Sequence, residues 1–271
     1  MVQVKDVLKW IDARAPFRYA ESWDNCGLQV GDPEASVKRV LVALDPSSQS
    51  FQEAENLGCQ CLVTHHPLLF RPLSAVRMDR FPGNLVIRAL QKGIHVISAH
   101  TNLDSAREGT NEQWVRLLSL RSVVPLESQS SWSEEPTYGG MGRVGNLPGP
   151  VSLKTFAEQI RNALGGIPIR VVGDQGTQIR RVALCTGSGG SFIEKVISEG
   201  VEAYVTGDVK YHEAQRAVES GLNVIDVGHF ASERLVVGPL ADYLKLQADR
   251  EGTPVEVLTA FAESDPFWIL Q

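Results

Sequence analysis

The chain contains two stretches that repeat each other in sequence. Residues 39–66 correspond to residues 181–208, which begin 142 positions later, and in both an apolar strand-like run leads through a helical segment to a second apolar run. Each copy continues to a third apolar run, within residues 93–104 and 221–233, that ends with a histidine followed four residues later by a carboxylate. Because this duplicated unit places His, Asp and Glu at strand ends, it predicts two halves that converge on one metal centre.

Strand-like and helix-like segments alternate along most of the chain. Short apolar runs predict strands near residues 39–44, 60–64, 94–99, 168–172, 180–185, 203–206 and 223–227. Helical spacing predicts helices at residues 2–14 and near 48–57, 84–92, 110–119, 152–164, 191–199, 210–220 and 232–246. A capping box formed by Thr110 and Gln113 indicates that one of these helices begins at Thr110. Strands separated by helices of this length form βαβ units, which bury a largely parallel sheet between helical layers. The predicted fold class is α/β, with two pseudo-repeated three-layer αβα units around a shared di-metal site.

The alternation is interrupted by a polar run and five glycines between residues 127 and 150, which are typical of a connector that ends in a glycine-rich strand. We therefore place the domain boundary between residues 126 and 138. The first α/β unit is expected at residues 1–130 and the second at residues 131–271. The last predicted strand, near residues 254–260, could pair back with the first unit.

Composition narrows the class of protein. With 271 residues, of which 43% are hydrophobic, the chain can bury a core as one large or two modest domains. It shows neither a signal-peptide pattern nor the ~20 consecutive apolar residues of a membrane span, so we expect a cytoplasmic protein without a membrane partner. The four cysteines lack C-x-x-C spacing and are expected to be buried free thiols. A formal net charge of −6 gives no general attraction for nucleic acid, so a nucleic-acid partner is not expected.

Two predicted strands of the first copy end in metal-ligand residue types. His65 and His66 follow one strand, and Pro67 forces an extended turn in which both rings can converge. His100 and Asp104 follow the next strand, and open parallel sheets place ligands beyond these carboxyl ends. The alternative is that Asp104 caps a helix and that His100 is a hydrogen-bonded structural histidine.

The second copy adds a histidine and a carboxylate. Gly228 allows close backbone approach, and the spacing of His229 and Glu233 across a helix start brings both side chains to one face. Alternatively, Glu233 only stabilises the helix N-terminus by its charge. The combined ligands exceed the four that one tetrahedral zinc needs, which suggests two ions with a bridging carboxylate. Mixed nitrogen and oxygen ligands suit zinc, manganese, iron, cobalt or nickel. The predicted ligands are His65, His66, Asp104, His229 and Glu233.

Three further motifs each have a functional and a structural interpretation. Gly187–Gly190 could hold a phosphate on backbone amides, but without Lys or Arg in the motif a tight turn is favoured. Asp208 and His212 could be partners that orient the ligands, or an ordinary exposed helical pair. The turn at residues 23–25 could line the mouth of the site, or could hold a buried tryptophan beside a polar turn.

Several long motifs, in order along nearly the whole chain, resemble the NIF-three-like family, widely known as GTP cyclohydrolase 1 type 2 homologs. They are residues 23–28, 64–70, 98–104 with 109–112, 138–145, 187–190, 206–208 and 228–233. The resemblance implies two α/β units around a di-metal site and a ring-shaped homohexamer. By motif position it also implies the five ligands derived above. The chain corresponds to the short form, without the middle domain that longer members insert, and Cys26 stands where a serine is expected.

The metal set predicts a di-metal-dependent hydrolase acting on a small-molecule or nucleotide substrate. His100 and His212 are the candidate catalytic residues, as proton carriers. The family label implies opening of the guanine imidazole ring of GTP with release of formate, although no triphosphate-binding loop is evident in the sequence. The competing hypothesis is a non-catalytic metal-binding, metal-handling or regulatory protein that acts through partners.

Overall fold

Two compact units make up the computed structural model, which describes residues 1–128 and 139–270. Unit 1 consists of Met1–Ala106 together with Val236–Ser264. Unit 2 consists of Arg107–Leu235 together with Asp265–Gln271. Each unit is therefore assembled from two separate segments of the chain.

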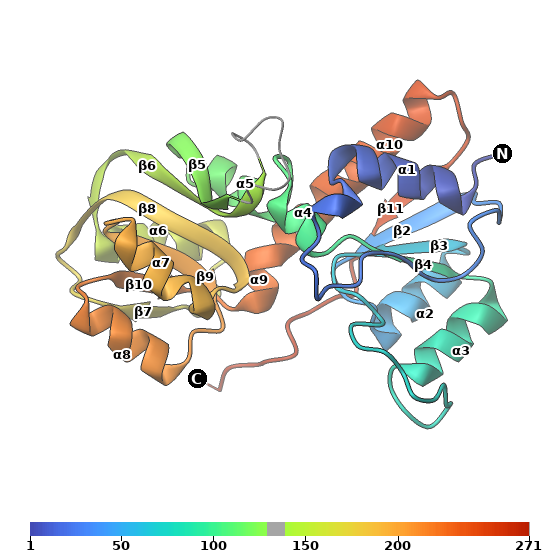
Figure 1. Cartoon of the computed structure of the whole chain (residues 1–271), viewed down its shortest axis with the longest axis horizontal. Coiled ribbons are helices and arrows are strands. Elements are labelled where there is room, and N and C mark those ends of the chain that lie inside the picture. The colour runs from blue at the N-terminus through green and yellow to red at the C-terminus, as the bar shows by residue number, and fades with distance from the viewer. Residues whose placement is uncertain (129–138, 271) are drawn as a thin grey trace. The chain divides into compact units, whose positions relative to one another are not determined.

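Unit 1 is built on a five-stranded sheet with helices on both sides (Figure 1). Its strands lie in the order β1 (Gly27–Val30), β4 (His95–Ser98), β3 (Cys61–Thr64), β2 (Arg39–Ala43) and β11 (Glu256–Thr259). Only the edge strand β1 is antiparallel to its neighbour. The helices are α1 (Val4–Arg14), α2 (Ser48–Asn56), α3 (Gly83–Lys92), the short α4 (Thr101–Ser105) and α10 (Val237–Arg250), with a 3-10 turn at Phe17–Tyr19. The last strand thus lies beside β2 of the first repeat, a pairing that the sequence left open.

Alternation along the strands explains the layers of unit 1. Leu41 and Leu62 pack with Phe51 of α2 and Leu85 of α3 in one buried cluster. Their strand neighbours, such as Val42, are equally buried but point to the opposite face, because successive side chains alternate across a sheet. Helix α10 packs on β2 and β11 at that second face, and α1 packs on α10. A sheet buried on both faces needs nearly continuous apolar strands, as β2 and β3 have.

Unit 2 repeats this plan with a larger, mixed sheet. Its strands lie in the order β5 (Arg121–Ser128), β6 (Gly140–Ser152), β8 (Gln178–Ser188), β9 (Ala203–Gly207), β10 (Asn223–Asp226) and β7 (Arg170–Val172). Strands β8, β9 and β10 are parallel, and the other pairings are antiparallel. The helices are α5 (Thr110–Leu117), α6 (Leu153–Ala163), α7 (Ile193–Ser198), α8 (Tyr211–Glu219) and α9 (His229–Glu233), with 3-10 turns at Gly190–Phe192 and Arg234–Val236.

Two apolar clusters cover the two faces of this second sheet. Leu184 and Val205 pack on one face with Phe156 of α6, whereas Cys185 and Tyr204 pack on the other with helix α7. Both units therefore have the predicted three-layer α/β architecture, which confirms the fold class.

The structure differs from the sequence prediction in several elements. The sheets are mixed, because the edge strands β1, β5 and β7 run antiparallel to their neighbours. The predicted domain boundary, between residues 126 and 138, falls between β5 and β6, which pair in one sheet. Residues 129–138 of this range lie outside the described part of the chain. The helix expected near 232–246 is divided into α9 and α10, since Pro239 is accommodated in the first turn of a helix but not in its interior. Helix α5 begins at Thr110, as predicted, but its N-cap is Gly109, and the Thr110 hydroxyl accepts a hydrogen bond from that of Thr186.

The cysteines are free, and all but the half-buried Cys26 are buried. Burial raises the pKa of the Cys59 thiol to about 11. Burial, with the hydrogen bond and charge of Asp24, raises that of Cys26 to about 12. These thiols therefore stay protonated at neutral pH. Across residues 1–128 and 139–270, no helix combines the length and the apolar composition needed to cross a membrane.

Candidate metal centre

In unit 1 the loop after β3 is fixed by hydroxyl groups from two strand ends. The Thr64 hydroxyl donates to the carbonyl oxygen of His66 at 2.7 Å, and the Ser98 hydroxyl donates to that of His65 at 2.9 Å. Both hydroxyl-bearing residues are fully buried. These bonds satisfy backbone groups that an ordinary strand ladder would have paired, so the two adjacent histidines can leave the regular strand geometry.

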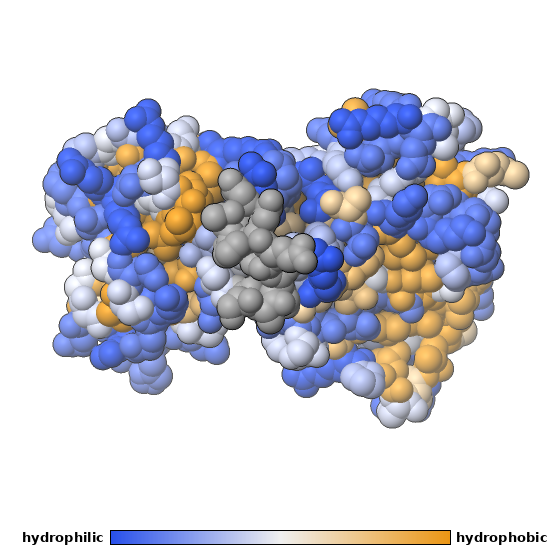
Figure 2. Space-filling view, turned by 45° about the horizontal axis from the view of Figure 1, so that its top comes forward, coloured by the Kyte–Doolittle hydropathy of each residue, from blue (hydrophilic) through white to orange (hydrophobic). Residues whose placement is uncertain are grey.

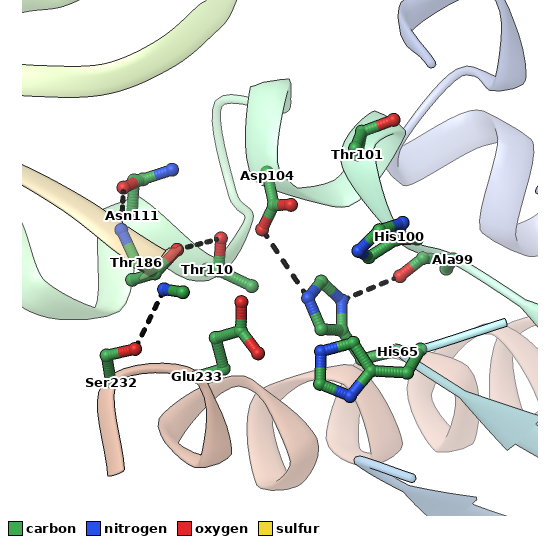
Figure 3. A network of polar contacts seen from close by, with 12 residues as sticks. His65, Ala99, His100, Thr101, Asp104, Thr110, Asn111, Thr186, Ser232 and Glu233 are labelled. Carbon is green, nitrogen blue, oxygen red and sulfur yellow. Dashed lines mark hydrogen bonds and ion pairs between the residues drawn. The ribbon is translucent and has the colours of Figure 1, made fainter. Parts of the chain in front are cut away.

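His65 is oriented by a backbone carbonyl (Figure 3). Its Nδ1 lies 2.9 Å from the carbonyl oxygen of Ala99, and because a carbonyl can only accept, Nδ1 carries the proton. Its Nε2 lies 3.6 Å from Oδ1 of Asp104 and therefore offers a lone pair beside a carboxylate oxygen. Two ligands bonded to one ion at about 2.1 Å are roughly 3–3.5 Å apart, so the pair is spaced for a shared ion.

His66 and His100 also direct Nδ1 to an oxygen acceptor, which in both cases belongs to a carboxylate. His66 Nδ1 lies 2.8 Å from Oδ1 of Asp45, and His100 Nδ1 lies 2.9 Å from Oδ1 of Asp24. His65, His66 and His100 each offer one ligand atom within 4.8 Å of the others. Unit 1 thus brings together its predicted ligands and places the predicted proton carrier, His100, beside them.

Asp24 holds His100 from a fully buried position. Its carboxylate also accepts hydrogen bonds from the backbone and hydroxyl of Thr101, at 3.1 and 2.5 Å, and from the Cys26 thiol at 3.1 Å. Burial alone would raise the pKa of Asp24, but His100, Thr101 and Cys26 together lower it below its ordinary value. The neighbouring Trp23 is 58% exposed, so the alternative of a buried tryptophan at this turn is wrong.

In unit 2 the helix α9 carries both ligand types. His229 Nε2 lies 3.1 Å from Oε2 of the buried Glu233, again the spacing of two ligands on one ion. His229 Nδ1 lies 2.8 Å from Oδ2 of Asp208, so Asp208 orients the ring, as one of the two interpretations of this residue held. Glu233 ends α9 and lies outside its first turn, so it does not act as a charge at the helix N-terminus. In unit 1, by contrast, Asp104 lies in the first turn of α4, whose N-cap residue His100 makes no side-chain cap bond.

Two supporting carboxylates were not found from the sequence. Asp226 accepts from the backbone amides of Val209, at 3.1 Å, and Gly228, at 3.0 Å, and so joins the loops that carry Asp208 and His229. In unit 1, Asp45 orients His66, and its own amide donates to the buried Glu263 at 2.7 Å. The only sequence signal for either residue is a carboxylate at or just beyond a strand end.

The glycine-rich loop of unit 2 supports Glu233 and is already bonded to protein groups. The amides of Gly187 and Gly189 donate to the hydroxyls of Ser232, at 2.8 Å, and Thr206, at 3.1 Å, which favours the turn interpretation over a phosphate loop. Asn111 accepts from the amide of Thr186 next to this loop (Figure 3). A Cβ at Gly187 would lie 2.3 Å from Oε1 of Glu233, so only glycine leaves room for that carboxylate.

His212 lies apart from the other histidine of its unit. It is exposed on α8, its Nδ1 is 3.2 Å from Oε1 of Gln215, and its ring contacts Tyr211. Both of these partners, Gln215 and Tyr211, lie on α8, the helix that carries His212. Its role as a proton carrier has no support from this geometry.

The chain matches known proteins over nearly its full length. The family model Duf34/NIF3 (NGG1p interacting factor 3) matches residues 2–266. Proteins named "GTP cyclohydrolase 1 type 2 homolog" from Clostridium acetobutylicum and Clostridium perfringens are 34% and 33% identical, each over 266 residues, and the alignments cover 98% of this chain and 98% and 99% of those proteins. The crystal structure of Staphylococcus aureus protein SA1388 is similar with a TM-score of 0.91 at 26% identity, covering 99% of both chains. The chain belongs to the Duf34/NIF3 family.

Proposed function

We propose that the protein is a di-metal-dependent hydrolase that acts on a small-molecule or nucleotide substrate. The observation that carries the proposal is that His65, His66 and His229 each direct Nδ1 to an oxygen acceptor. This fixes the tautomer in which Nε2 bears the lone pair that can bind a metal, an arrangement typical of ligating histidines. The ligand set exceeds what one ion requires, which supports two ions per chain. The proposed ligands are His65, His66, Asp104, His229 and Glu233.

The ligand chemistry suits zinc, manganese, iron, cobalt or nickel. Ions held there would supply Lewis acidity toward a substrate oxygen and toward water. His100 is proposed to accept and return a proton at Nε2 while Asp24 holds its Nδ1. We prefer His100 to His212 for this role, because the ring of His100 contacts those of His65 and His66.

Elemental analysis and a substrate screen test the proposal. After replenishment with zinc, manganese and iron, we expect up to two ions per chain and turnover of a nucleotide or phosphoester that Asp104→Ala and Glu233→Ala abolish. Absence of bound metal would contradict the proposal. Activity that survives in both variants would come from a contaminating enzyme. Full metal occupancy without turnover of any substrate would instead support the metal-handling alternative.

The name of the curated relatives points to GTP, but we expect no robust formate release from it. The amides of Gly187 and Gly189 donate to protein hydroxyls, and the formal net charge is −6. Both features disfavour a bound triphosphate. Formate release at an ordinary enzymic pace of ~1 per second, lost in both carboxylate variants, would refute this expectation.

We further propose a homohexamer in the cytoplasm. Exposed apolar side chains support assembly, since such patches mark interaction surfaces (Figure 2). They occur in unit 1 at Val76, Met78 and Phe81 and in unit 2 at Phe267, Trp268, Ile269 and Leu270. Leu68, two residues before Phe70, is buried in the core of unit 1. A light-scattering mass near one chain at micromolar concentration would exclude the hexamer.

A further inference from the structure

Three aromatic rings form a cluster at the surface of unit 1. Trp23 and Phe70 lie with ring centroids 5.8 Å apart, and each lies 6.3 Å from the ring of His100. The interplanar angles of the three pairs are 70°, 75° and 81°, so the rings meet edge to face. Each contact takes the edge of one ring and a face of the other, so what remains for a ligand is the exposed part of the two outer rings. Trp23 is 58% exposed and Phe70 is 44% exposed.

The two exposed rings are held in place by polar contacts beneath them. The Asn25 side chain donates to the carbonyl of Leu69 at 2.6 Å, and the amide of Leu69 donates to the Gln29 side chain at 2.7 Å. The Gln29 side chain in turn donates to the carbonyl of Asn25. The turn that carries Trp23 and the segment that carries Phe70 are thus cross-bonded to each other. Next to Trp23, the buried Asp24 carboxylate is fixed by five donor groups, from Asn25, Cys26, His100 and, twice, Thr101.

An exposed tryptophan on a rigid support is suited to stacking. A free indole face attracts planar, electron-poor rings, and stacking is effective for any heterocyclic base because each has a π-face. The His100 ring of this cluster also contacts two proposed metal ligands. Its ring centroid lies 5.1 Å from that of His65 and 5.6 Å from that of His66. A ring held on Trp23 would therefore keep its substituents close to those ligands.

We infer that Trp23 and Phe70 form a binding subsite for a planar heteroaromatic ring of the substrate. The inference rests on the proposed hydrolase function, because it takes the ring to be part of the molecule that is hydrolysed. It adds a substrate class, nitrogen heterocycles, which the metal ligands alone do not select. Trp23 stacks on the ring, and Phe70 supports the edge of the indole.

Equilibrium binding to the metal-replenished full chain tests the subsite. The probes are guanosine, adenosine and nicotinamide, with ribose as the ring-free control. We expect at least one ring-containing probe to bind at millimolar concentration or below, and ribose not to bind. Trp23→Leu should weaken binding roughly tenfold or more, whereas Trp23→Phe, which keeps a ring, should change it only about threefold. Phe70→Leu should have a smaller effect than Trp23→Leu. Phe261→Leu is the matched control, because Phe261 is 77% exposed in the same unit and should not alter binding.

Metal content, measured in the same samples, separates this inference from the proposed function. We expect Trp23→Leu to retain the full metal content of the unmodified protein. Loss of metal binding in the unmodified protein would refute the di-metal proposal, whereas the response of ring affinity to Trp23→Leu tests the subsite. If no ring-containing probe binds, or if Trp23→Leu binds them as tightly as the unmodified chain, the subsite is refuted. A fall in assembly mass without a fall in ring affinity would show instead that a second copy of the chain covers this surface.

Discussion

In unit 1 the strand β3 is followed by His65 and His66, whereas at the corresponding place in unit 2 the strand β9 ends in Gly207 and is followed by Asp208. The surroundings are alike. Both strands are central in a parallel trio, and the strand that follows each of them has an antiparallel edge partner. The same scaffold position thus supplies a proposed ligand, His66, in one unit and the orienting partner of a ligand, Asp208, in the other.

The units also differ in how their backbones hold these side chains. Unit 1 uses buried hydroxyls, and His65 is 1% exposed. Unit 2 uses glycines: a Cβ at Gly207 would lie 2.7 Å from the backbone of Gly228, and one at Gly187 would meet Glu233. The side chain of His229 remains 36% exposed. A duplicated scaffold therefore fixes where ligands stand, while the local residues decide how rigidly each is held.

Removing a ligand from either unit gives the largest expected effect. Losing a residue that orients a ligand typically lowers metal affinity by up to ~100-fold. If the ions need both units, His65→Ala and His229→Ala remove a ligand itself, so each should lower metal affinity by more than that factor. Competition with a chelator, followed by elemental analysis, measures this loss. His212→Ala is the control, because this side chain is exposed and its hydrogen bond among the described residues is to Gln215 on the same helix, α8. Full occupancy in His229→Ala would show that unit 1 binds metal without unit 2.

The orienting carboxylates allow a matched comparison between the units. Asp45 and Asp208 each lie 2.8 Å from a histidine Nδ1, and their side chains are 43% and 47% exposed. Asp45→Ala and Asp208→Ala should therefore weaken metal affinity by similar factors, roughly 10–100-fold. Both variants should fold normally, as circular dichroism would report. A large effect in one unit only would mean that the two histidines are not equivalent ligands.

The sequence predicted the strand ends well because apolar runs and turn residues are local signals. The five proposed ligands could be named since each stands directly after a predicted strand or one turn later. Asp45 and Asp226 could not be named, because their roles depend on loops that meet only in the folded unit. The edge strands β1 and β5 were also missed, since half-exposed strands lack a continuous apolar run. The placement of Trp23 depends on its contacts with Phe70 and His100, which are distant in sequence.

A glycine substitution tests the claim that unit 2 depends on close backbone approach. Gly187→Ala adds a Cβ that would clash with Glu233 at a residue with φ of +69°, so it combines steric overlap with left-handed strain. Gly166→Ala, at φ +82° with open space around its Cβ, is the matched control for strain alone. We expect Gly187→Ala to cost about 1–3 kcal/mol more in the free energy of unfolding than the control, and also to weaken metal binding. Equal costs in urea unfolding would exclude the steric contribution.

Acid should affect the support of His100 in unit 1. The pKa of Asp24 is lowered in the folded protein, so its carboxylate stabilises the fold above the unfolded pKa of about 3.9. This contribution is lost as the pH falls below that value toward the lower folded pKa. Urea unfolding at several pH values should show Asp24→Asn less stable than the unmodified chain at pH 6, with the difference shrinking below about pH 4. A difference that is independent of pH would mean that the ionised carboxylate is not the stabilising species.

The smallest expected effect comes from the thiol group that donates to Asp24 in unit 1. Cys26 donates its thiol hydrogen to Asp24 at 3.1 Å, at the position where the family resemblance implied a serine. A thiol is a weak donor, so Cys26→Ala should lower the free energy of unfolding by about 1 kcal/mol, near the lower end for bonds to charged groups. Cys26→Ser restores a stronger but shorter donor and should stay within about 0.5 kcal/mol of the unmodified chain. Urea unfolding of the three proteins at pH 7 measures the series. If Cys26→Ala is as stable as Cys26→Ser, the remaining donors from Asn25, Thr101 and His100 are enough to hold Asp24, and the buried support of unit 1 does not depend on the thiol contact.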